Sequence, residues 1–484
     1  MLTTLIFMPA AAALLLSFTK KAEDNVLYRL LVAAALVPFL MVLQAWPHFV
    51  PSDPLEPMAS LSEFRDWIPA IGAFYSLRLD GLNLPFLTLV TFIGLAAHLI
   101  PPEEEENLRR RGALLLLWEA ALIGSFLAQD YILFLLFWAV SSAPIYFLMK
   151  PGSEDGQLAA QSFLLSSLVS ILALGAGLLI FSGSLGAAAS VSAEEAVNTV
   201  TTGLDPDTQW WIFLTVFIGC GLRVPIFPLH IWLRAAMDRL PVSANILLVG
   251  GFLPLGIYGL LRFAVMVLTD AAAAFTVAIA AAGTINLIFG ALAALGSEDR
   301  CQKTAYLVMS CTGIALLGTA TLTIGGITGA LYTTLSLGLA AAFSLSIATP
   351  SANAISQRWR LMLHGLDAAQ HLRLPGFAGF IGLFLVFTAL YQNFRPLSVS
   401  IFAALFVTGV DYARSLAGLM DSMPGDTAQG ETQDSLPSSL ASLLKGAGAA
   451  AVLLLGGSIL LGVKPDLFLG VVEPTVKGLM PFLE

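Results

Sequence analysis

Four ionisable side chains lie inside or at the ends of long apolar runs in this sequence: Arg223, His230, Glu119 and Asp130. An ionisable group is costly in an apolar membrane environment, so such residues mark candidate functional sites for carrying a proton or another ion. Histidine and carboxylate side chains can bind and release protons, whereas arginine stays protonated under all ordinary conditions. The residue types therefore indicate an ion path in which Arg223 contributes a fixed charge.

Each of these residues also has a structural interpretation. His230 is either one member of a proton path or a histidine bonded to the backbone of an interrupted helix. Glu119 is the expected partner of Arg223, and a buried charge pair is often only structural. Asp130 lies at the boundary of an apolar run, where an interfacial position is expected.

The composition is typical of a membrane protein. Of the 484 residues, 57% are hydrophobic and 11% are charged, whereas soluble domains carry about 25% charged residues. Apolar stretches of about 20 residues recur along the chain, and each is long enough to cross a bilayer as a helix. The sequence contains no nucleotide-binding loop, metal-ligand spacing or nucleophile arrangement. We therefore expect no catalysis, metal or cofactor in this chain alone.

The apolar stretches predict an all-α polytopic membrane protein with about 14 transmembrane helices. The predicted spans are residues 1–18, 27–46, 82–100, 113–128, 131–149, 160–182, 209–233, 243–268, 272–296, 302–322, 326–348, 374–392, 396–418 and 446–463. Of the 23 Lys and Arg residues, sixteen lie in or beside odd-numbered loops, six in or beside even-numbered loops and the C-terminal tail, and Arg223 inside a span. The positive-inside rule then predicts cytoplasmic odd-numbered loops and both termini on the opposite side.

Several short signatures resemble the antiporter-like membrane subunits of respiratory complex I, most of all the chain M (chain 4) type. Those subunits are similar in turn to the large subunits of multisubunit sodium/proton antiporters. The resemblance covers roughly residues 80–465. Its signatures are the run Gly221–Leu233 with its continuation to Gly256–Phe263, Asp80-Gly81-Leu82, Glu119 through Asp130 to Trp138 and Pro144-Ile145-Tyr146, Ala305-Tyr306 with Gly313, Leu374–Phe380, and Gly462-Val463-Lys464-Pro465.

The resemblance implies two five-helix repeats of inverted topology, residues 113–268 and residues 272–420. Residues 1–112 would hold the first three helices with a loop, and residues 421–484 a mobile loop, the last helix and a tail. One helix in each repeat is expected to be broken, since unwound backbone in such repeats lines a polar site at mid-membrane. The residues expected to break helices seven and twelve are Pro225, Pro228, Pro375, Gly376 and Gly379.

The resemblance also implies a file of proton-carrying groups, and this sequence departs from it at almost every position. The family has a glutamate on helix five, lysines on helices seven and eight, a histidine and a lysine on helix eleven, a histidine in its Ser-His-Met-Gly run, and a glutamate or lysine on helix twelve. At or near these positions the sequence has Ala139, Arg223, Pro254, Ser336, Ala340, Cys311 and Leu383. The predicted proton path is therefore degenerate.

The leading hypothesis is a membrane-arm subunit of a complex I-like or multisubunit antiporter assembly, acting as a scaffold or carrying a modified ion path. Two alternatives remain: a membrane subunit of an inorganic-carbon uptake complex, and an ordinary proton-translocating subunit. The expected partners are other membrane subunits and the lipid bilayer, without nucleic acid. The expected location is a bacterial inner or thylakoid-type membrane. Any NAD(P)H- or ferredoxin-quinone oxidoreductase chemistry would belong to other subunits.

Overall fold

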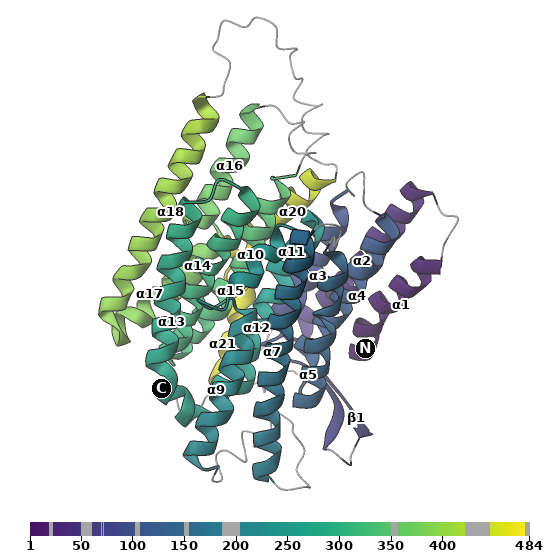
Figure 1. Ribbon diagram of the computed structural model, residues 1–484, viewed down its shortest axis with the longest axis vertical. Coiled ribbons are helices and arrows are strands. Elements are labelled where there is room, and N and C mark those ends of the chain that lie inside the picture. Colours follow the sequence, from purple (N-terminus) through teal and green to yellow (C-terminus); the bar gives the residue numbers. More distant parts are fainter. Residues whose placement is uncertain are drawn as a thin grey trace, which may run out of the picture.

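The chain forms an elongated bundle of long, closely packed helices (Figure 1). This computed structural model describes residues 1–18, 23–49, 61–68, 70, 72–101, 107–149, 154–185, 204–349, 357–421 and 446–479. Among them, seven helices are long and apolar enough to cross a membrane, or up to eight if the bent pair α20 (Ala447–Val463) and α21 (Asp466–Leu479) is one span. The chain is thus a mostly helical, multi-pass membrane protein.

The first half of the chain holds most of the short elements. Its helices are α1 (Leu2–Phe18), α2 (Asp24–Ala45), η1 (Trp46–His48), α3 (Leu84–Leu99), α4 (Leu108–Leu127), α5 (Tyr131–Val140), α6 (Ala143–Leu148), α7 (Glu154–Leu185), α9 (Pro206–Arg223), α10 (Ile231–Met237), α11 (Val242–Leu247), the π-helical η3 (Leu248–Phe252), α12 (Leu253–Leu260) and the π-helical η4 (Leu261–Val265). The remaining helices before α20 are α13 (Thr269–Leu295), α14 (Arg300–Ala320), α15 (Ile324–Ser346), α16 (Gln357–His371), α17 (Ala378–Asn393) and α18 (Arg395–Asp421).

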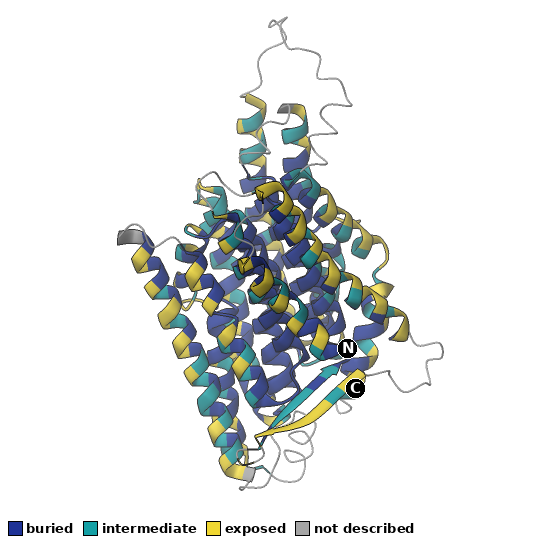
Figure 2. Cartoon of the chain, turned by 90° about the vertical axis from the view of Figure 1, so that its right-hand side faces the viewer, coloured by how far each residue is buried: buried dark blue, intermediate teal, exposed yellow. Residues whose placement is uncertain are grey.

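Two helical segments form the centre of the bundle. The continuous run from α11 to η4 and the helix α15 are buried along their whole membrane-length windows, as expected for helices that are apolar all round. They approach closely where Gly338 of α15 faces Gly250 of η3: a Cβ atom built on Gly338 would lie 3.1 Å from the Gly250 Cα. Figure 2 shows that exposed residues lie mostly along the outer helices and buried residues along the interior.

A two-stranded hairpin lies between the predicted spans 27–46 and 82–100, in a segment for which the sequence analysis predicts no secondary structure. Strand β1 (Leu61–Ile68) pairs antiparallel with β2 (Ala73–Leu79), with Arg65 opposite Tyr75. The Glu63 carboxylate accepts hydrogen bonds from the backbone N–H groups of Leu2 and Thr3, at 2.8 and 3.1 Å. These N–H groups belong to the first turn of α1 and have no partner within that helix. The hairpin therefore joins the start of α1 to the rest of the bundle.

Two helices near the end of the chain lie outside the predicted spans. The helix α16 occupies most of residues 349–373, which connect the predicted spans 326–348 and 374–392. The helix α21 follows the predicted span 446–463 and packs against α15: Phe468 lies edge-on to Tyr332, with ring centroids 4.7 Å apart. Phe468 is 1% exposed, so α21 is part of the core.

The chain leaves the helical conformation at both places where the sequence predicts a break. Pro225 and Pro228 lie between the end of α9 and the start of α10. Pro375 and Gly376 lie between α16 and α17, and Gly379 lies in the first turn of α17. Gly376 has a φ of 99°, a left-handed conformation that glycine adopts without strain.

Candidate functional site

The Arg223 side chain points into the protein from the last turn of α9 and is 3% exposed. Its Nη1 donates to the Ser141 Oγ at 3.2 Å, and its Nη2 donates to the Trp138 carbonyl oxygen at 3.0 Å and the Ser142 Oγ at 3.2 Å. The guanidinium also lies over two rings, 3.6 Å from the centroid of Trp138 and 3.9 Å from that of Phe252. Such desolvated cation–π contacts contribute about 2 kcal/mol each.

The partners of Arg223 exist because the helix formed by α5 and α6 is interrupted at Ser141 and Ser142. The Ser142 N–H donates to the Ala139 carbonyl oxygen at 3.1 Å and not to the Trp138 carbonyl oxygen four residues before it. The Trp138 carbonyl oxygen instead accepts hydrogen bonds from the Ser141 hydroxyl at 2.7 Å and from the guanidinium of α9.

Glu119 is not the partner of Arg223, contrary to the sequence prediction. The Glu119 side chain is fully buried on α4, and neither carboxylate oxygen has a hydrogen-bond partner among the described residues. It packs against Gly94 of α3, where a Cβ atom would lie 2.7 Å from the Glu119 Cδ. The sequence places both residues inside predicted spans. It does not show that the Arg223 side chain of α9 lies at the break between α5 and α6 and not beside Glu119 on α4, so the prediction was wrong.

Replacing Glu119 with methionine tests whether this carboxyl group is structural. A buried polar group without a partner costs about 1 to 3 kcal/mol, so we expect Glu119→Met to raise the melting temperature of the purified complex. Proton flux in vesicles should then be unchanged. Leu122, one turn further along α4 and equally buried, provides a packing control as Leu122→Met. If Glu119→Met lost proton flux and Leu122→Met kept it, the Glu119 carboxyl group would be shown to carry protons.

His230 lies immediately before α10 and contacts two aromatic rings. Its ring centroid lies 5.6 Å from that of Phe227 and 5.2 Å from that of Phe289. The carbonyl of Pro225 accepts a hydrogen bond from the Asn286 amide of α13 at 3.2 Å, and the N–H of Phe227 donates to the Asn286 oxygen at 2.7 Å. The hydrogen-bond partner of the Pro225 carbonyl and the Phe227 N–H at this break is therefore Asn286 and not His230. The sequence did not point to Asn286.

Asp130 caps the start of α5. Its carboxylate accepts hydrogen bonds from the N–H of Leu133 at 2.9 Å and from the N–H of Phe74 in β2 at 3.4 Å. Burial raises the pKa of the Asp130 carboxyl to about 6, although these hydrogen bonds oppose the shift. No hydrogen bond or ion pair joins Asp130 to Arg223, His230 or Glu119 within the described ranges. The four predicted site residues therefore do not form one site.

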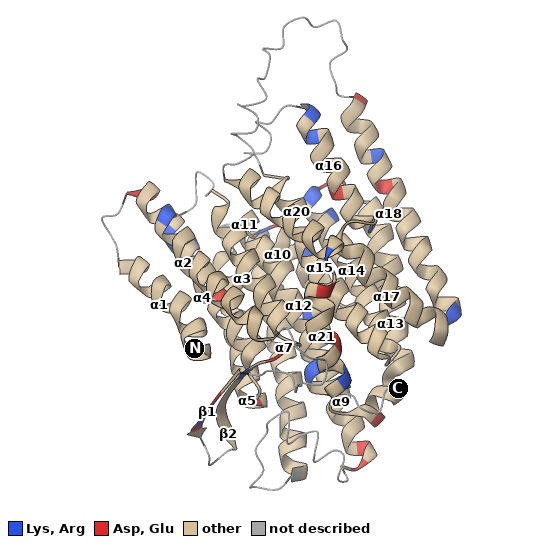
Figure 3. Ribbon diagram, turned by 180° about the vertical axis from the view of Figure 1, so that it is seen from behind, with Lys and Arg blue, Asp and Glu red and all other residues tan. Residues whose placement is uncertain are grey.

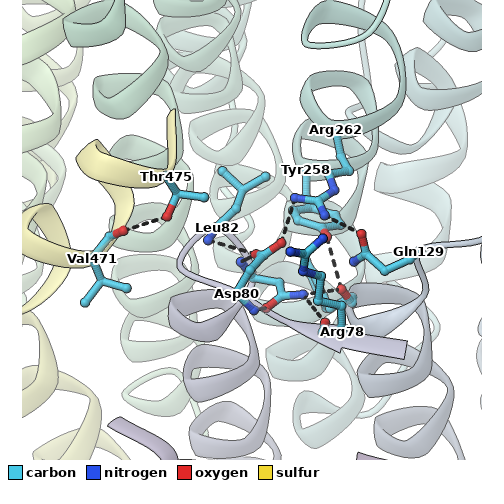
Figure 4. Close-up of polar contacts among 10 residues, drawn as sticks. Arg78, Asp80, Leu82, Gln129, Tyr258, Arg262, Val471 and Thr475 are labelled. Atoms are coloured by element: carbon cyan, nitrogen blue, oxygen red, sulfur yellow. Dashed lines mark hydrogen bonds and ion pairs between the residues drawn. The ribbon is translucent and has the colours of Figure 1, made fainter. Parts of the chain in front are cut away.

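A buried ion pair lies beneath the hairpin, between two residues that the sequence analysis quoted only as signatures. Arg262 forms an ion pair with Asp80, in which its Nη1 lies 2.8 Å from the Asp80 Oδ2, and its Nη2 donates a hydrogen bond to the Gln129 side-chain oxygen (Figure 4). The other oxygen of Asp80 accepts the N–H groups of Leu82 and Asn83, at 3.0 and 3.1 Å. This pair joins β2, the start of α5 and η4.

Apart from Arg223, the positions where the resemblance expects proton-carrying groups are occupied by small or apolar side chains. Ala139 lies in α5, Pro254 in α12, Cys311 in α14 and Leu383 in α17. Cys311 also lines a cavity of about 10 Å³ beside the break between α16 and α17. Among the described residues, no group of three or more His, Cys, Asp or Glu side chains could hold a metal ion.

Comparisons with known proteins agree on one family. The family described as "NADH:quinone oxidoreductase/Mrp antiporter, TM" matches residues 128–408. The NAD(P)H-quinone oxidoreductase chain 4 1 of Synechococcus elongatus is 32% identical over 441 residues, which are 86% of this chain and 80% of that protein. Chain 4 2 of Thermosynechococcus vestitus is 31% identical over 413 residues, which are 81% of this chain and 75% of that protein.

Two solved structures show the same fold. A chain of respiratory complex I from Thermus thermophilus matches with a TM-score of 0.83 and 22% sequence identity. The match covers 100% of this chain and 100% of that chain. A chain of the Mrp complex from Dietzia sp. has a TM-score of 0.80 and 18% identity, over 99% of this chain and 52% of its own length. The chain therefore has the same overall fold as a chain of each of these two assemblies.

Proposed function

The chain belongs to the NADH:quinone oxidoreductase/Mrp antiporter family, and from this premise we propose that it is an antiporter-like membrane subunit of a multisubunit complex. Its partners are then other membrane subunits of a complex I-like or antiporter-type assembly, in a bacterial inner or thylakoid-type membrane. Redox cofactors reside in other subunits. The chain acts either as a scaffold or as part of a modified ion path.

The fixed position of Arg223 is the observation that supports a degenerate path. A switching ion pair needs a base that releases its proton and a carboxylate that can approach it. Arginine does not release its proton, and this one is held by three hydrogen bonds and two aromatic rings. Within the described part of the chain no carboxylate forms an ion pair with it. In this proposal the path of proton-carrying groups is interrupted at Arg223.

The finer features of the architecture belong to the same proposal. We infer 14 transmembrane helices, both termini on the non-cytoplasmic side, and two inverted repeats over residues 113–268 and 272–420. The interruptions between α9 and α10 and between α16 and α17 support one broken helix in each repeat. Labelling single cysteines at each terminus from either side of sealed vesicles tests the orientation.

Introducing ionisable side chains at two of the family's proton-carrying positions tests whether the proton path is interrupted. We expect the double change Ala139→Glu with Pro254→Lys to leave proton flux in vesicles containing the whole complex unchanged. An isolated buried charge neutralises by shifting its pKa, and Arg223 still cannot release a proton. Pro254→Ala separates the effect of removing proline from the effect of adding the lysine.

The matching test concerns His230. His230→Ala should leave flux unchanged, because the break between α9 and α10 is satisfied by Asn286. A gain of flux in the double variant, or its loss in His230→Ala with assembly intact, would favour an ordinary proton-translocating subunit. Mass spectrometry of the purified complex decides the host assembly. Redox subunits support the present proposal, and a carbonic-anhydrase-like partner supports inorganic-carbon uptake.

A further inference from the structure

A second group of ionisable side chains lies far along the chain from Arg223, on three helices. Asp367 and His371 lie on α16, Asp411 and Tyr412 on α18, and Lys303 on α14. The four residues on α16 and α18 are between 4% and 6% exposed. Figure 3 shows acidic and basic residues along α16 and α18 at the end of the bundle where these helices project. The sequence analysis assigned none of these residues a role.

His371 is the centre of this group. Its Nδ1 lies 3.0 Å from the Tyr412 Oη, 3.1 Å from the backbone oxygen of Asp367 and 3.3 Å from the Asp367 Oδ1. A carbonyl and a carboxylate oxygen can only accept hydrogen bonds, so the Nδ1 of His371 carries the proton in the neutral ring. The Nε2 is then the basic nitrogen. It is buried and has no hydrogen-bond partner among the described residues.

The basic nitrogen belongs to a residue that lines a small polar cavity. The cavity measures about 10 Å³, enough for about one water molecule. Both amide atoms of Gln370, which also lines it, are buried without a partner in the described part of the chain. The hydroxyl-bearing residues Ser336 and Ser458 complete the polar lining. A water molecule would therefore find both donors and acceptors beside the His371 ring.

Asp367 is positioned to balance a positive charge on His371. Its Oδ2 accepts hydrogen bonds from Tyr412 at 3.1 Å and from Ser344 at 3.2 Å, and its Oδ1 faces the ring. Tyr412 therefore touches both the carboxylate and the imidazole, so it positions one relative to the other. The Asp–Tyr–His arrangement keeps the ring orientation fixed and leaves the Nε2 without a partner among the described residues.

The other titratable and charged groups around the site are largely paired. Lys303 forms an ion pair with Asp411 at 2.8 Å and donates to Ser415 at 3.0 Å. Arg300 contacts the imidazole of His364, and Arg373 donates to the Gly379 carbonyl at 3.2 Å. Arg373 and Cys311 line the same cavity as His371. The Lys303 side chain is 18% exposed, so it forms the outer end of the group.

We propose that His371 is a proton-binding site of the second half of the chain. A proton from solvent reaches the Nε2 through a water molecule in the cavity, the ring becomes an imidazolium, and the Asp367 carboxylate balances its charge. The water molecule gives one proton to the ring and takes up another from solvent, so it stays neutral and no hydroxide remains. This inference rests on the proposed function, since such a site serves a subunit placed in a proton-translocating assembly. It assigns the chain a protonatable group apart from the interrupted path at Arg223.

Nitrogen NMR of ¹⁵N-histidine-labelled full-length chain in lipid bilayers tests the proposal. The chain has five histidines, and the difference between the parent and His371→Gln identifies the His371 signals. We expect a neutral ring with a protonated Nδ1 at high pH, and uptake of a second proton at the Nε2 when the pH is lowered. Asp367→Asn should abolish this uptake, and Tyr412→Phe should shift its midpoint while keeping the ring packing.

His98 is the matched control. It is buried to a similar extent, and its Nδ1 lies 2.8 Å from the Gly94 carbonyl oxygen, but no carboxylate forms an ion pair with it within the described residues. Its signals should therefore remain those of a neutral ring when His371 takes up its second proton. A His371 ring that stays neutral throughout, that carries its proton on Nε2, or that titrates unchanged in Asp367→Asn would overturn the proposal. These spectra are independent of the flux measurements, so the two proposals can fail separately.

Discussion

Arg223→Ala is expected to destabilise the purified complex by about 3 to 5 kcal/mol, or to prevent its assembly. The change removes two desolvated cation–π contacts, worth about 2 kcal/mol each, and a set of charge-assisted hydrogen bonds worth about 1.5 to 3 kcal/mol. Part of this loss is offset because alanine carries no charge that has to be desolvated on burial. It also leaves a cavity between Trp138 and Phe252. The measurement is the melting temperature and subunit composition of the complex, followed by proton flux normalised to the assembled complex.

Two variants control this result. Arg223→Lys keeps the charge, but an ammonium group cannot form the planar fork or stack between two rings, so intermediate stability is expected. Arg395→Ala removes an exposed arginine that lies 4.8 Å from the Tyr391 ring centroid, and should cost about 0.5 to 1 kcal/mol. If Arg223→Ala assembled normally but lost proton flux, the path would run through Arg223 and the scaffold interpretation would be wrong.

Breaking the ion pair between Asp80 and Arg262 should have a comparable effect. Arg262→Leu leaves the Asp80 carboxylate buried without its charged partner, a change that typically costs about 3 to 5 kcal/mol. The remaining hydrogen bonds from Leu82 and Asn83 compensate only in part. We expect a marked fall in melting temperature together with loss of protection of the hairpin against proteolysis.

A double-mutant cycle separates the pair from its surroundings. Asp80→Asn combined with Arg262→Leu should be less destabilising than the sum of the single changes, with a coupling of about 1 to 3 kcal/mol. Additive effects would show that the two residues contribute independently. Arg78→Leu, on the strand next to Asp80, controls for the loss of a nearby positive charge.

Hydropathy and proline placement were sufficient to predict the membrane class and the places where the chain leaves the helical conformation. These are local properties: each apolar run specifies its own helix, and Pro225 or Pro375 acts on its own turn. The burial of Arg223 also followed from its place in an apolar run. The hydrogen-bond partners of Arg223 could not be predicted in the same way. They depend on the helix break at Ser141 and Ser142, and Pro144 is the one local sequence signal for that break.

The features that the sequence analysis missed share a different cause. The helix α16 carries Arg358, Arg360, Asp367 and two histidines, and this polarity concealed it from a search for apolar spans. The hairpin is short and lies in a proline-rich polar segment, and its strands are stabilised by contacts with α1 and α5. Asn286 looked like an ordinary polar residue within a span. Tertiary contacts, which a single sequence does not display, give all of these residues their roles.

The close approach of Gly338 and Gly250 has a mechanical consequence. With no side chain between α15 and the π-helical segment η3, a displacement of α15 along its axis must either move η3 or create a clash with its backbone. A π-helical turn is a local irregularity of the hydrogen-bond ladder and can shift more easily than a regular helix. The two halves of the chain can therefore transmit strain to each other without any titratable group. A subunit built in this way can serve a larger assembly as a mechanical link, in keeping with the scaffold role proposed above.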